Sequence, residues 1–294
     1  MRLLHLQGVV LFLTALFLFA VIDTSFKYLS VFIAVPLLLW LRFAVHLLVM
    51  LILVAPSQGW ALVVTQRPWL TLLRALMLTC SSLLLQLAFR FMPLAETSSL
   101  FFINPLLVAL LARPLLGEKL RMRTWLAIMA GFSGALLIAR PGGALVGEGV
   151  LYTVCAAFCY AVYQVLTRQL SRTEPVMRQL FYTALIGTIA MSPVLAMYRL
   201  EMALTLLQSL LALSLGVLAG VGHFLFIRAF RDSPASSLSP MLYFQIVWVT
   251  LLGWLVFDQH PDGLSTLGML VIAASGLALI MDRPRHRNVS ADVR

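Results

Sequence analysis

Two pairs of charged residues, each spaced four positions apart, interrupt long apolar segments of the 294-residue chain: Asp23 with Lys27, and Arg42 with His46. Residues four apart share one face of a helix. The first pair predicts an ion pair or a proton site at the mouth of a cavity, with a pair in the lipid headgroup region as the alternative. Arg42 stays protonated in proteins, which predicts an anionic protein partner or the anionic group of a substrate. His46 is a candidate proton relay.

Four neutral amides lie at or near the middle of other apolar segments: Gln86, Asn104, Gln164 and Gln245. An amide donates and accepts hydrogen bonds, so it can orient a polar substrate or, alternatively, join two helices. Asn104 and Gln245 are 141 residues apart and occupy equivalent positions of an internal repeat. Two equivalent amides predict a substrate-binding site between the two halves of the molecule.

Aromatic residues near these amides are candidates for stacking on a planar ligand, with filling of helix interfaces as the alternative. Tyr163 and Tyr243, which each neighbour a glutamine, are the stronger candidates, and Tyr160, Phe244 and Trp248 complete the set.

Two further ionisable residues are candidates for proton binding. His223 lies in the middle of an apolar segment, where a satisfied buried histidine is the alternative. Glu96 opens an apolar segment, where a carboxylate can cap a helix instead. The sequence contains no HExxH motif and no cysteine and histidine set with zinc-ligand spacing. We therefore expect no catalytic residues, no metal and no cofactor.

The composition decides which elements position these residues. Hydrophobic residues make up 62% of the chain and charged residues 11%, against about 45–50% and about 25% in soluble domains. This excludes cytosolic enzymes and secreted disulfide scaffolds and predicts an all-α membrane protein, because the apolar runs are continuous rather than alternating. We expect ten transmembrane helices, at 8–29, 35–54, 69–89, 93–115, 124–139, 147–167, 177–198, 207–230, 235–257 and 263–281.

The basic residues predict the orientation of these helices. Of the 21 lysine and arginine residues, sixteen fall on the side of the N-terminus, four on the other side, and Arg42 inside a helix. Positive residues concentrate on the cytoplasmic side, so both termini are expected in the cytoplasm of a cell with the chain in its inner membrane. The net charge of +10 is then explained without a nucleic-acid partner.

An internal repeat divides the chain into two halves. The segment Ala88–Pro93 resembles Ala229–Pro234, at an offset of 141 residues. We expect one repeat over 1–140 and a second over 145–294, which ends in a short basic tail. Because five helices are an odd number, the two repeats must enter the membrane in opposite directions, an arrangement that recurs in secondary transporters.

The repeat block resembles the EamA domain of the drug/metabolite transporter superfamily. The resemblance rests on Pro93–Ser99, on Asn104-Pro105, on Gly117–Leu120 and on Gly131–Gly134, and it covers essentially the whole chain. It implies ten helices in two inverted five-helix repeats. Two shorter segments, Asp23–Leu29 and Phe257–Asp262, are similar to bacterial riboflavin and S-adenosylmethionine carriers.

These features together predict a secondary transporter that moves small organic metabolites by alternating access. An exporter of amino acids, drugs or other metabolites is the alternative with the same architecture, and a membrane scaffold or sensor is the non-transport alternative. The expected partners are the lipid bilayer and a small-molecule substrate. The oligomeric state is left open between monomer and homodimer.

Overall fold

The computed structural model of the protein describes residues 2–92, 94–116, 122–139, 147–198, 204–233, 238–258 and 263–281. Every regular element among these residues is helical. Six helices in this part of the chain are long and apolar enough to cross a membrane, and three shorter apolar helices accompany them. The prediction of an all-helical membrane protein is confirmed.

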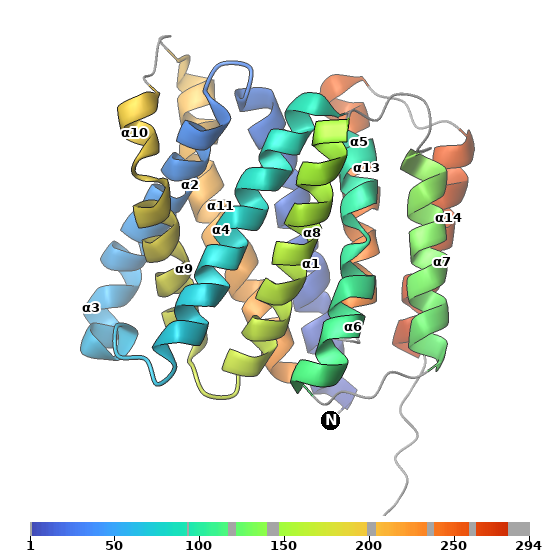
Figure 1. The fold of residues 1–294 in the computed structure, drawn as a ribbon, viewed down its shortest axis with the longest axis horizontal. Coiled ribbons are helices and arrows are strands. Elements are labelled where there is room, and N and C mark those ends of the chain that lie inside the picture. The colour runs from blue at the N-terminus through green and yellow to red at the C-terminus, as the bar shows by residue number, and fades with distance from the viewer. Residues whose placement is uncertain are drawn as a thin grey trace, which may run out of the picture.

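The helices follow one another in the order shown by the colours of Figure 1. The first half contains α1 (Arg2–Leu29), α2 (Val35–Val49), the π-helical turn η1 (Met50–Val54), α3 (Ala55–Gln58), the 3₁₀ turn η2 (Gly59–Leu62), α4 (Pro68–Phe91), α5 (Leu94–Phe101), α6 (Asn104–Leu116) and α7 (Met122–Ala139). The second half contains α8 (Gly147–Leu170), α9 (Val176–Met191), α10 (Val194–Met197), α11 (Leu206–Asp232), the 3₁₀ turn η3 (Ser239–Tyr243), α13 (Phe244–Phe257) and α14 (Gly263–Met281).

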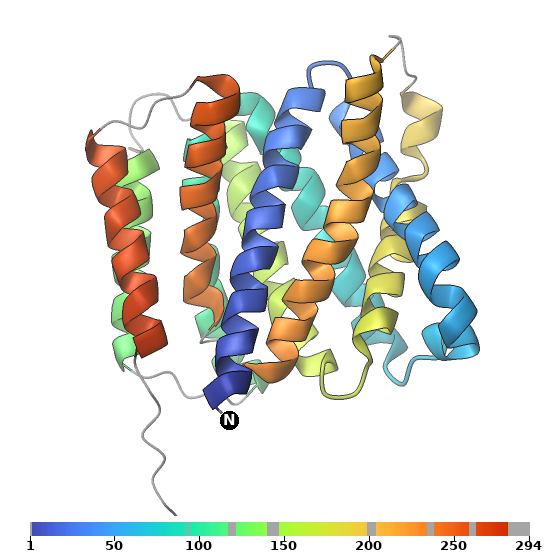
Figure 2. The ribbon, with the colours of Figure 1, turned by 180° about the vertical axis from the view of Figure 1, so that it is seen from behind.

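The two halves repeat one another in helix order and in helix contacts. The helices α8, α9, α11, α13 and α14 begin about 140 residues after α1, α2, α4, α6 and α7. In space, α1 packs against α11 and α13, and the equivalent helix α8 packs against α4 and α6. The equivalent helices α2 and α9 contact each other, as do α7 and α14, which stand at one edge of the molecule (Figures 1 and 2).

Three of the predicted continuous helices are interrupted, so their expected bounds 93–115, 177–198 and 235–257 were wrong. The first divides into α5 and α6, the second into α9 and α10, and the third into η3 and α13. Each break lies beside a proline, at Pro105, Pro193 and Pro240, because proline has no N–H for the preceding turn and its ring clashes with that turn. Breaks at equivalent places of two repeats occur in secondary transporters, where they border the substrate site.

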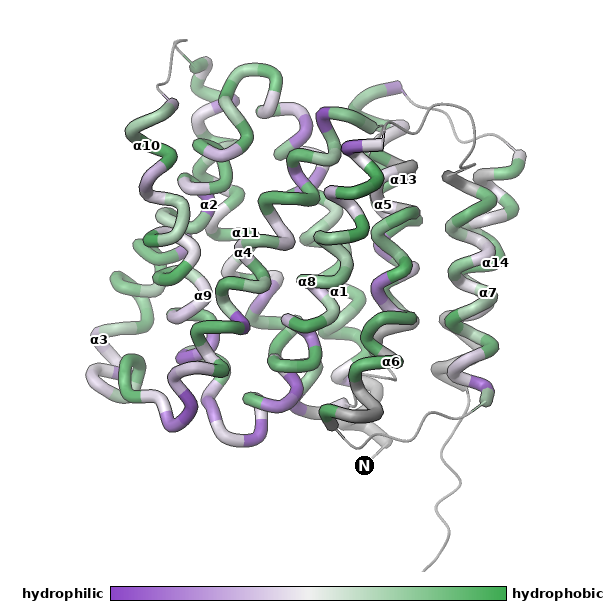
Figure 3. The backbone as a smooth tube through the Cα atoms, viewed as in Figure 1, coloured by the Kyte–Doolittle hydropathy of each residue, from purple (hydrophilic) through white to green (hydrophobic). Residues whose placement is uncertain are grey.

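The outer surface of the bundle is apolar along most of its height. Large apolar side chains such as Leu53 on η1, and Leu206 and Leu210 on α11, are exposed, and hydrophilic residues gather toward the end that carries the N-terminus (Figure 3). An apolar exterior suits contact with lipid chains.

Close packing of α11 against α2 positions part of the interior. A Cβ atom added at Gly216 would come within 2.8 Å of the carbonyl oxygen of Arg42. One turn later, Gly220 faces His46, with 3.1 Å from such a Cβ to the imidazole Cδ2. Small residues allow two helices to approach this closely. The glycines therefore bring Arg42 on α2 within reach of His223 on α11.

Candidate substrate-binding cavity

A cavity lies between the helices at the centre of the bundle. Its empty volume is about 480 Å³, including the part open toward solvent. The lining combines polar side chains with apolar and aromatic ones, among them Phe19 and Phe101. The polar side chains come from α1, α2, α4, α8, α11 and α13 and include Asp23, Arg42, Gln86, Tyr160, His223 and Gln245.

Asp23 presents the carboxylate of this cavity. It lies near the end of α1 and is only 8% exposed. Gln86 donates to Oδ1 of Asp23 at 3.2 Å, and Gln245 donates to Oδ2 at 3.1 Å. Both donors are neutral, so they hydrogen-bond the carboxylate without cancelling its charge. The predicted polar residues Asp23, Gln86 and Gln245 are therefore brought together from α1, α4 and α13.

Arg42 supplies a positive charge to the same cavity. Its guanidinium is 6% exposed, and its Nη2 lies 3.3 Å from Nε2 of His223. Its Nε atom is buried and has no hydrogen-bond partner in the described part of the chain. No ion pair joins Arg42 to Asp23 among the described residues, although the two charges interact electrostatically across the cavity. An anion and a cation thus line one cavity without neutralising each other directly.

A second buried arginine, Arg74, continues this polar chain. Nδ1 of His223 lies 3.2 Å from the hydroxyl of Tyr163, and Arg74 donates from Nη2 to that hydroxyl at 3.3 Å. Arg74 is fully buried on α4, and it also donates to Thr167 and Thr183, each at 2.8 Å. We had assigned Arg74 to a loop facing the cytoplasm, and that assignment was wrong. Its position inside the predicted segment 69–89 was the signal available in the sequence.

The amides Asn104 and Gln164 form a separate contact outside the cavity lining. Gln164 donates to Oδ1 of Asn104 at 2.6 Å, and Asn104 donates to the carbonyl of Ala157 at 2.8 Å. Both amides are completely buried. With the repeat offset of 141 residues, Asn104 and Gln164 are equivalent to Gln245 and Asp23. The same interhelical contact therefore occurs twice, once buried and neutral and once charged and facing the cavity.

The predicted pair of Asp23 and Lys27 is not formed in the described part of the chain. The Lys27 amine lies 5.5 Å from the centre of the Phe257 ring. A long lysine side chain extends toward the end of its helix, whereas the short Asp23 side chain stays inside the bundle. His46 is buried with Nε2 unpartnered, and it lies beside the cavity rather than in its lining.

The predicted aromatic residues separate into different environments. Tyr160 lines the cavity, whereas Tyr163 is buried beneath it and stacks on Tyr160 with ring centres 5.5 Å apart. Tyr243 is buried, lies against Gly131 and donates to the carbonyl of Ile128 at 3.1 Å. Trp248 is 37% exposed and contacts Phe17. Glu96 belongs to α5, but its side chain lies outside the described residues.

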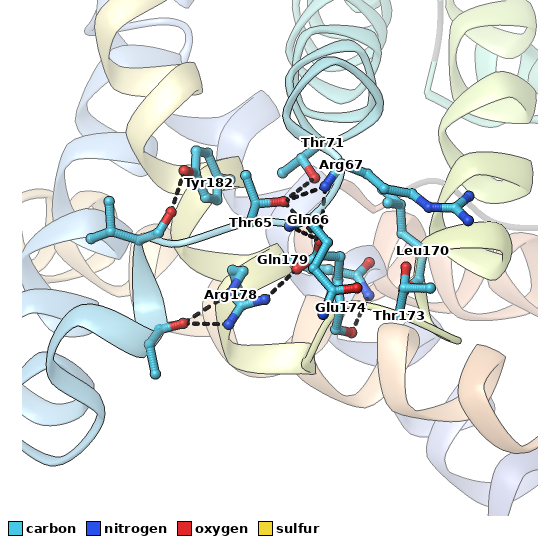
Figure 4. A network of polar contacts seen from close by, with 12 residues as sticks. Thr65, Gln66, Arg67, Thr71, Leu170, Thr173, Glu174, Arg178, Gln179 and Tyr182 are labelled. Carbon is cyan, nitrogen blue, oxygen red and sulfur yellow. Dashed lines mark hydrogen bonds and ion pairs between the residues drawn. The ribbon is translucent and has the colours of Figure 1, made fainter.

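A polar network ties the loop before α4 to the loop between α8 and α9 (Figure 4). The carboxylate of Glu174 accepts hydrogen bonds from the Thr65 hydroxyl at 2.7 Å and from the Gln66 amide at 2.8 Å, and it pairs with Arg178 at 2.6 Å. Arg178 also donates to the carbonyl of Ala61. Burial alone would raise the pKa of Glu174, but these hydrogen bonds outweigh it and hold the pKa below its ordinary value. The sequence analysis did not identify this residue.

Replacing Glu174 by glutamine is expected to lower stability at pH 7 by about 1–3 kcal/mol, because a buried network loses its charge-assisted bonds. The carboxylate stabilises the fold fully above the ordinary glutamate pKa of about 4.3, and its contribution is lost as the pH falls through the lower folded value. The difference in melting temperature between wild type and E174Q should therefore shrink from pH 7 to pH 4. The exposed Glu148 supplies the control, E148Q. An undiminished difference at pH 4 would contradict a role of the charge.

Two segments of the chain, residues 6–140 and residues 147–281, each match the EamA-like transporter family. The chain belongs to the EamA-like transporter family. Membership confirms the resemblance that the repeat block indicated, and it confirms the predictions of a transporter and of a multi-pass membrane protein. The family's domain occurs twice in the chain, once in each half.

Several EamA-family and structural relatives extend over nearly all of the chain. It is 24% identical to the S-adenosylmethionine uptake transporter of Rickettsia prowazekii over 94% of this chain and 93% of that protein. It is 26% identical to the riboflavin transporter of Vibrio cholerae over 92% and 91% of the two chains. A solved protein structure shares the fold with a TM-score of 0.72 at 20% identity, covering 94% of this chain and 95% of that chain.

Proposed function

We propose that this EamA-family chain is a ten-helix carrier, built from inverted repeats over 1–140 and 145–294, that moves a zwitterionic metabolite across the inner membrane by alternating access. Both termini face the cytoplasm in this arrangement. S-Adenosylmethionine is the proposed substrate, because relatives of this chain carry that name and because its charges suit the cavity. The site consists of Asp23, Arg42, Gln86 and Gln245.

The observation that carries the proposal is the pair of opposite charges in one cavity. Asp23 and Arg42 are each more than nine-tenths buried, and each is hydrogen-bonded only to neutral groups in the described part of the chain. Buried charges are costly unless they meet an opposite charge. A ligand that carries a cation toward Asp23 and a carboxylate toward Arg42 supplies both partners.

The chemistry of the relatives' ligands separates the candidates. S-Adenosylmethionine carries a sulfonium, an ammonium and a carboxylate, and its purine can stack on Tyr160, Phe19 or Phe101 of the lining. Riboflavin has a planar ring but no charges at neutral pH, so it would leave Asp23 and Arg42 unpartnered. A free amino acid carries the same ammonium and carboxylate, which makes amino-acid export the second candidate function.

The test is ligand-dependent stability of the full chain purified in detergent, followed by uptake into liposomes. S-Adenosylmethionine is expected to raise the unfolding temperature in a saturable way, since a ligand at a hundred times its dissociation constant adds about 2.7 kcal/mol. Methylthioadenosine, which keeps the purine but lacks the charged amino-acid part, is the matched control and should have little effect. Stabilisation by riboflavin or by methylthioadenosine, but not by S-adenosylmethionine, would refute the zwitterionic substrate.

A further inference from the structure

The contact between Arg42 and His223 decides where the proton of the imidazole lies. A guanidinium has only donors and does not lose its proton in proteins. Nε2 of His223, at 3.3 Å from Nη2 of Arg42, must therefore accept. A neutral imidazole has one acceptor nitrogen, so the hydrogen is on Nδ1, where it faces the Tyr163 hydroxyl at 3.2 Å. His223 is neutral in this conformation and has no free acceptor for a further proton.

The surroundings of His223 contain more positive than negative charge. His223 is 3% exposed, and Phe19 lies against its ring with ring centres 4.8 Å apart. One carboxylate, two arginines and the other titratable groups face it from the neighbouring helices of the described chain. These groups are Asp23 on α1, Arg42 and His46 on α2, Arg74 on α4, and Tyr160 and Tyr163 on α8.

We propose that His223 is a proton-binding site whose occupation and the binding of a cationic group at Asp23 exclude each other, with Arg42 as the group that moves. A proton from solvent binds to Nε2 of His223. An N–H then points at the N–H of Arg42, so the contact between them breaks. The released guanidinium turns to Asp23, which lines the same cavity and holds two neutral donors that leave its charge uncancelled.

Mutual exclusion gives the carrier a means of exchange. With His223 neutral, Arg42 is held away and Asp23 is open to a cationic substrate. With His223 protonated, Arg42 occupies Asp23 and the substrate is released. By linkage, the substrate favours proton release by the same factor as the proton weakens substrate binding. The proposal rests on the proposed function for its substrate, but the protonation state of His223 stands on the geometry alone.

The experiment measures the affinity of the detergent-purified full chain for S-adenosylmethionine between pH 7.5 and pH 5.5. Competition with one proton weakens binding by at most tenfold per pH unit, and we expect about tenfold or more over this range. In H223Q, whose amide oxygen can still accept from Arg42, the affinity should no longer vary with pH. H46Q, which removes the neighbouring histidine outside the lining, is the control and should keep the wild-type dependence. A pH dependence retained in H223Q, lost in H46Q, or absent from wild type would overturn the proposal.

A second measurement separates the two proposals. Nitrogen NMR of histidine-labelled protein, with the His223 signal assigned by its loss in H223Q, is expected to show the neutral form protonated on Nδ1 at pH 7.5. The form protonated on Nε2, or a charged ring at that pH, would overturn the inference even if S-adenosylmethionine binds. If S-adenosylmethionine fails to bind at every pH, the proposed substrate is wrong, and the NMR result alone decides on His223.

Discussion

Replacement of Asp23 by asparagine is expected to weaken S-adenosylmethionine binding about 100-fold and to reduce uptake into liposomes correspondingly. The asparagine keeps the size of the side chain and an oxygen that accepts from Gln86 or Gln245, so the loss is that of the charge. Removing one partner of a buried charge pair costs about 2–5 kcal/mol, and each 1.4 kcal/mol is about tenfold in affinity. Isothermal binding measurements on the purified variant give the number directly.

Asp258 offers the matched control for this substitution. It lies at the end of α13 with φ of 56°, outside the cavity lining. Asparagine tolerates this left-handed conformation as well as aspartate does, so D258N removes a carboxylate without straining the backbone. Binding should be nearly unchanged in D258N. Equal losses in the two variants, or full affinity in D23N, would contradict the role of Asp23 as the cation-binding carboxylate.

The equivalent amides Asn104 and Gln245 are expected to respond differently to replacement by leucine. Asn104 is completely buried and uses both ends of its amide, toward Gln164 and Ala157. In N104L these two partners lose their hydrogen bonds, at about 1–3 kcal/mol for each buried group. The yield of folded protein and its melting temperature should fall sharply.

Gln245 lines the cavity and contacts only Asp23 through its side chain in the described part of the chain. Q245L should therefore fold with nearly wild-type stability and lose roughly tenfold or more in affinity, since one hydrogen bond to a charged group contributes about 1.5–3 kcal/mol. Size-exclusion profiles and melting curves report the folding of both variants, and ligand titration reports the site. Intact folding of N104L together with lost binding would instead place Asn104 in the substrate site.

Much of the fold follows from residues visible in the sequence. The continuous apolar segments predict membrane helices, and the match of Ala88–Pro93 with Ala229–Pro234 predicts two related halves. The interruptions beside Pro105, Pro193 and Pro240 were missed, although proline chemistry accounts for each of them. A long hydrophobic segment indicates that the chain crosses the membrane but does not indicate whether the crossing helix is continuous.

The site was predicted in its members but not in its grouping. Asp23, Arg42, Gln86, His223 and Gln245 were all candidates, and the structure brings them into one cavity. Whether they bind substrate remains a prediction. The sequence did not distinguish them from other polar candidates that the structure places in separate contacts or outside the cavity, which are Lys27, His46, Asn104, Tyr163, Gln164, Tyr243 and Trp248.

The sequence by itself determined the class of protein, the repeat and the short supply of polar groups in the interior. The tertiary structure decided which of two equivalent contacts, Asp23 with Gln245 or Gln164 with Asn104, faces the cavity. It also decided that Arg74 is buried. The physical reason is that helices in lipid are apolar on their outer as well as their inner faces. Amphipathic periodicity, which reports the buried face of a soluble helix, therefore does not report how a membrane helix is rotated against its neighbours.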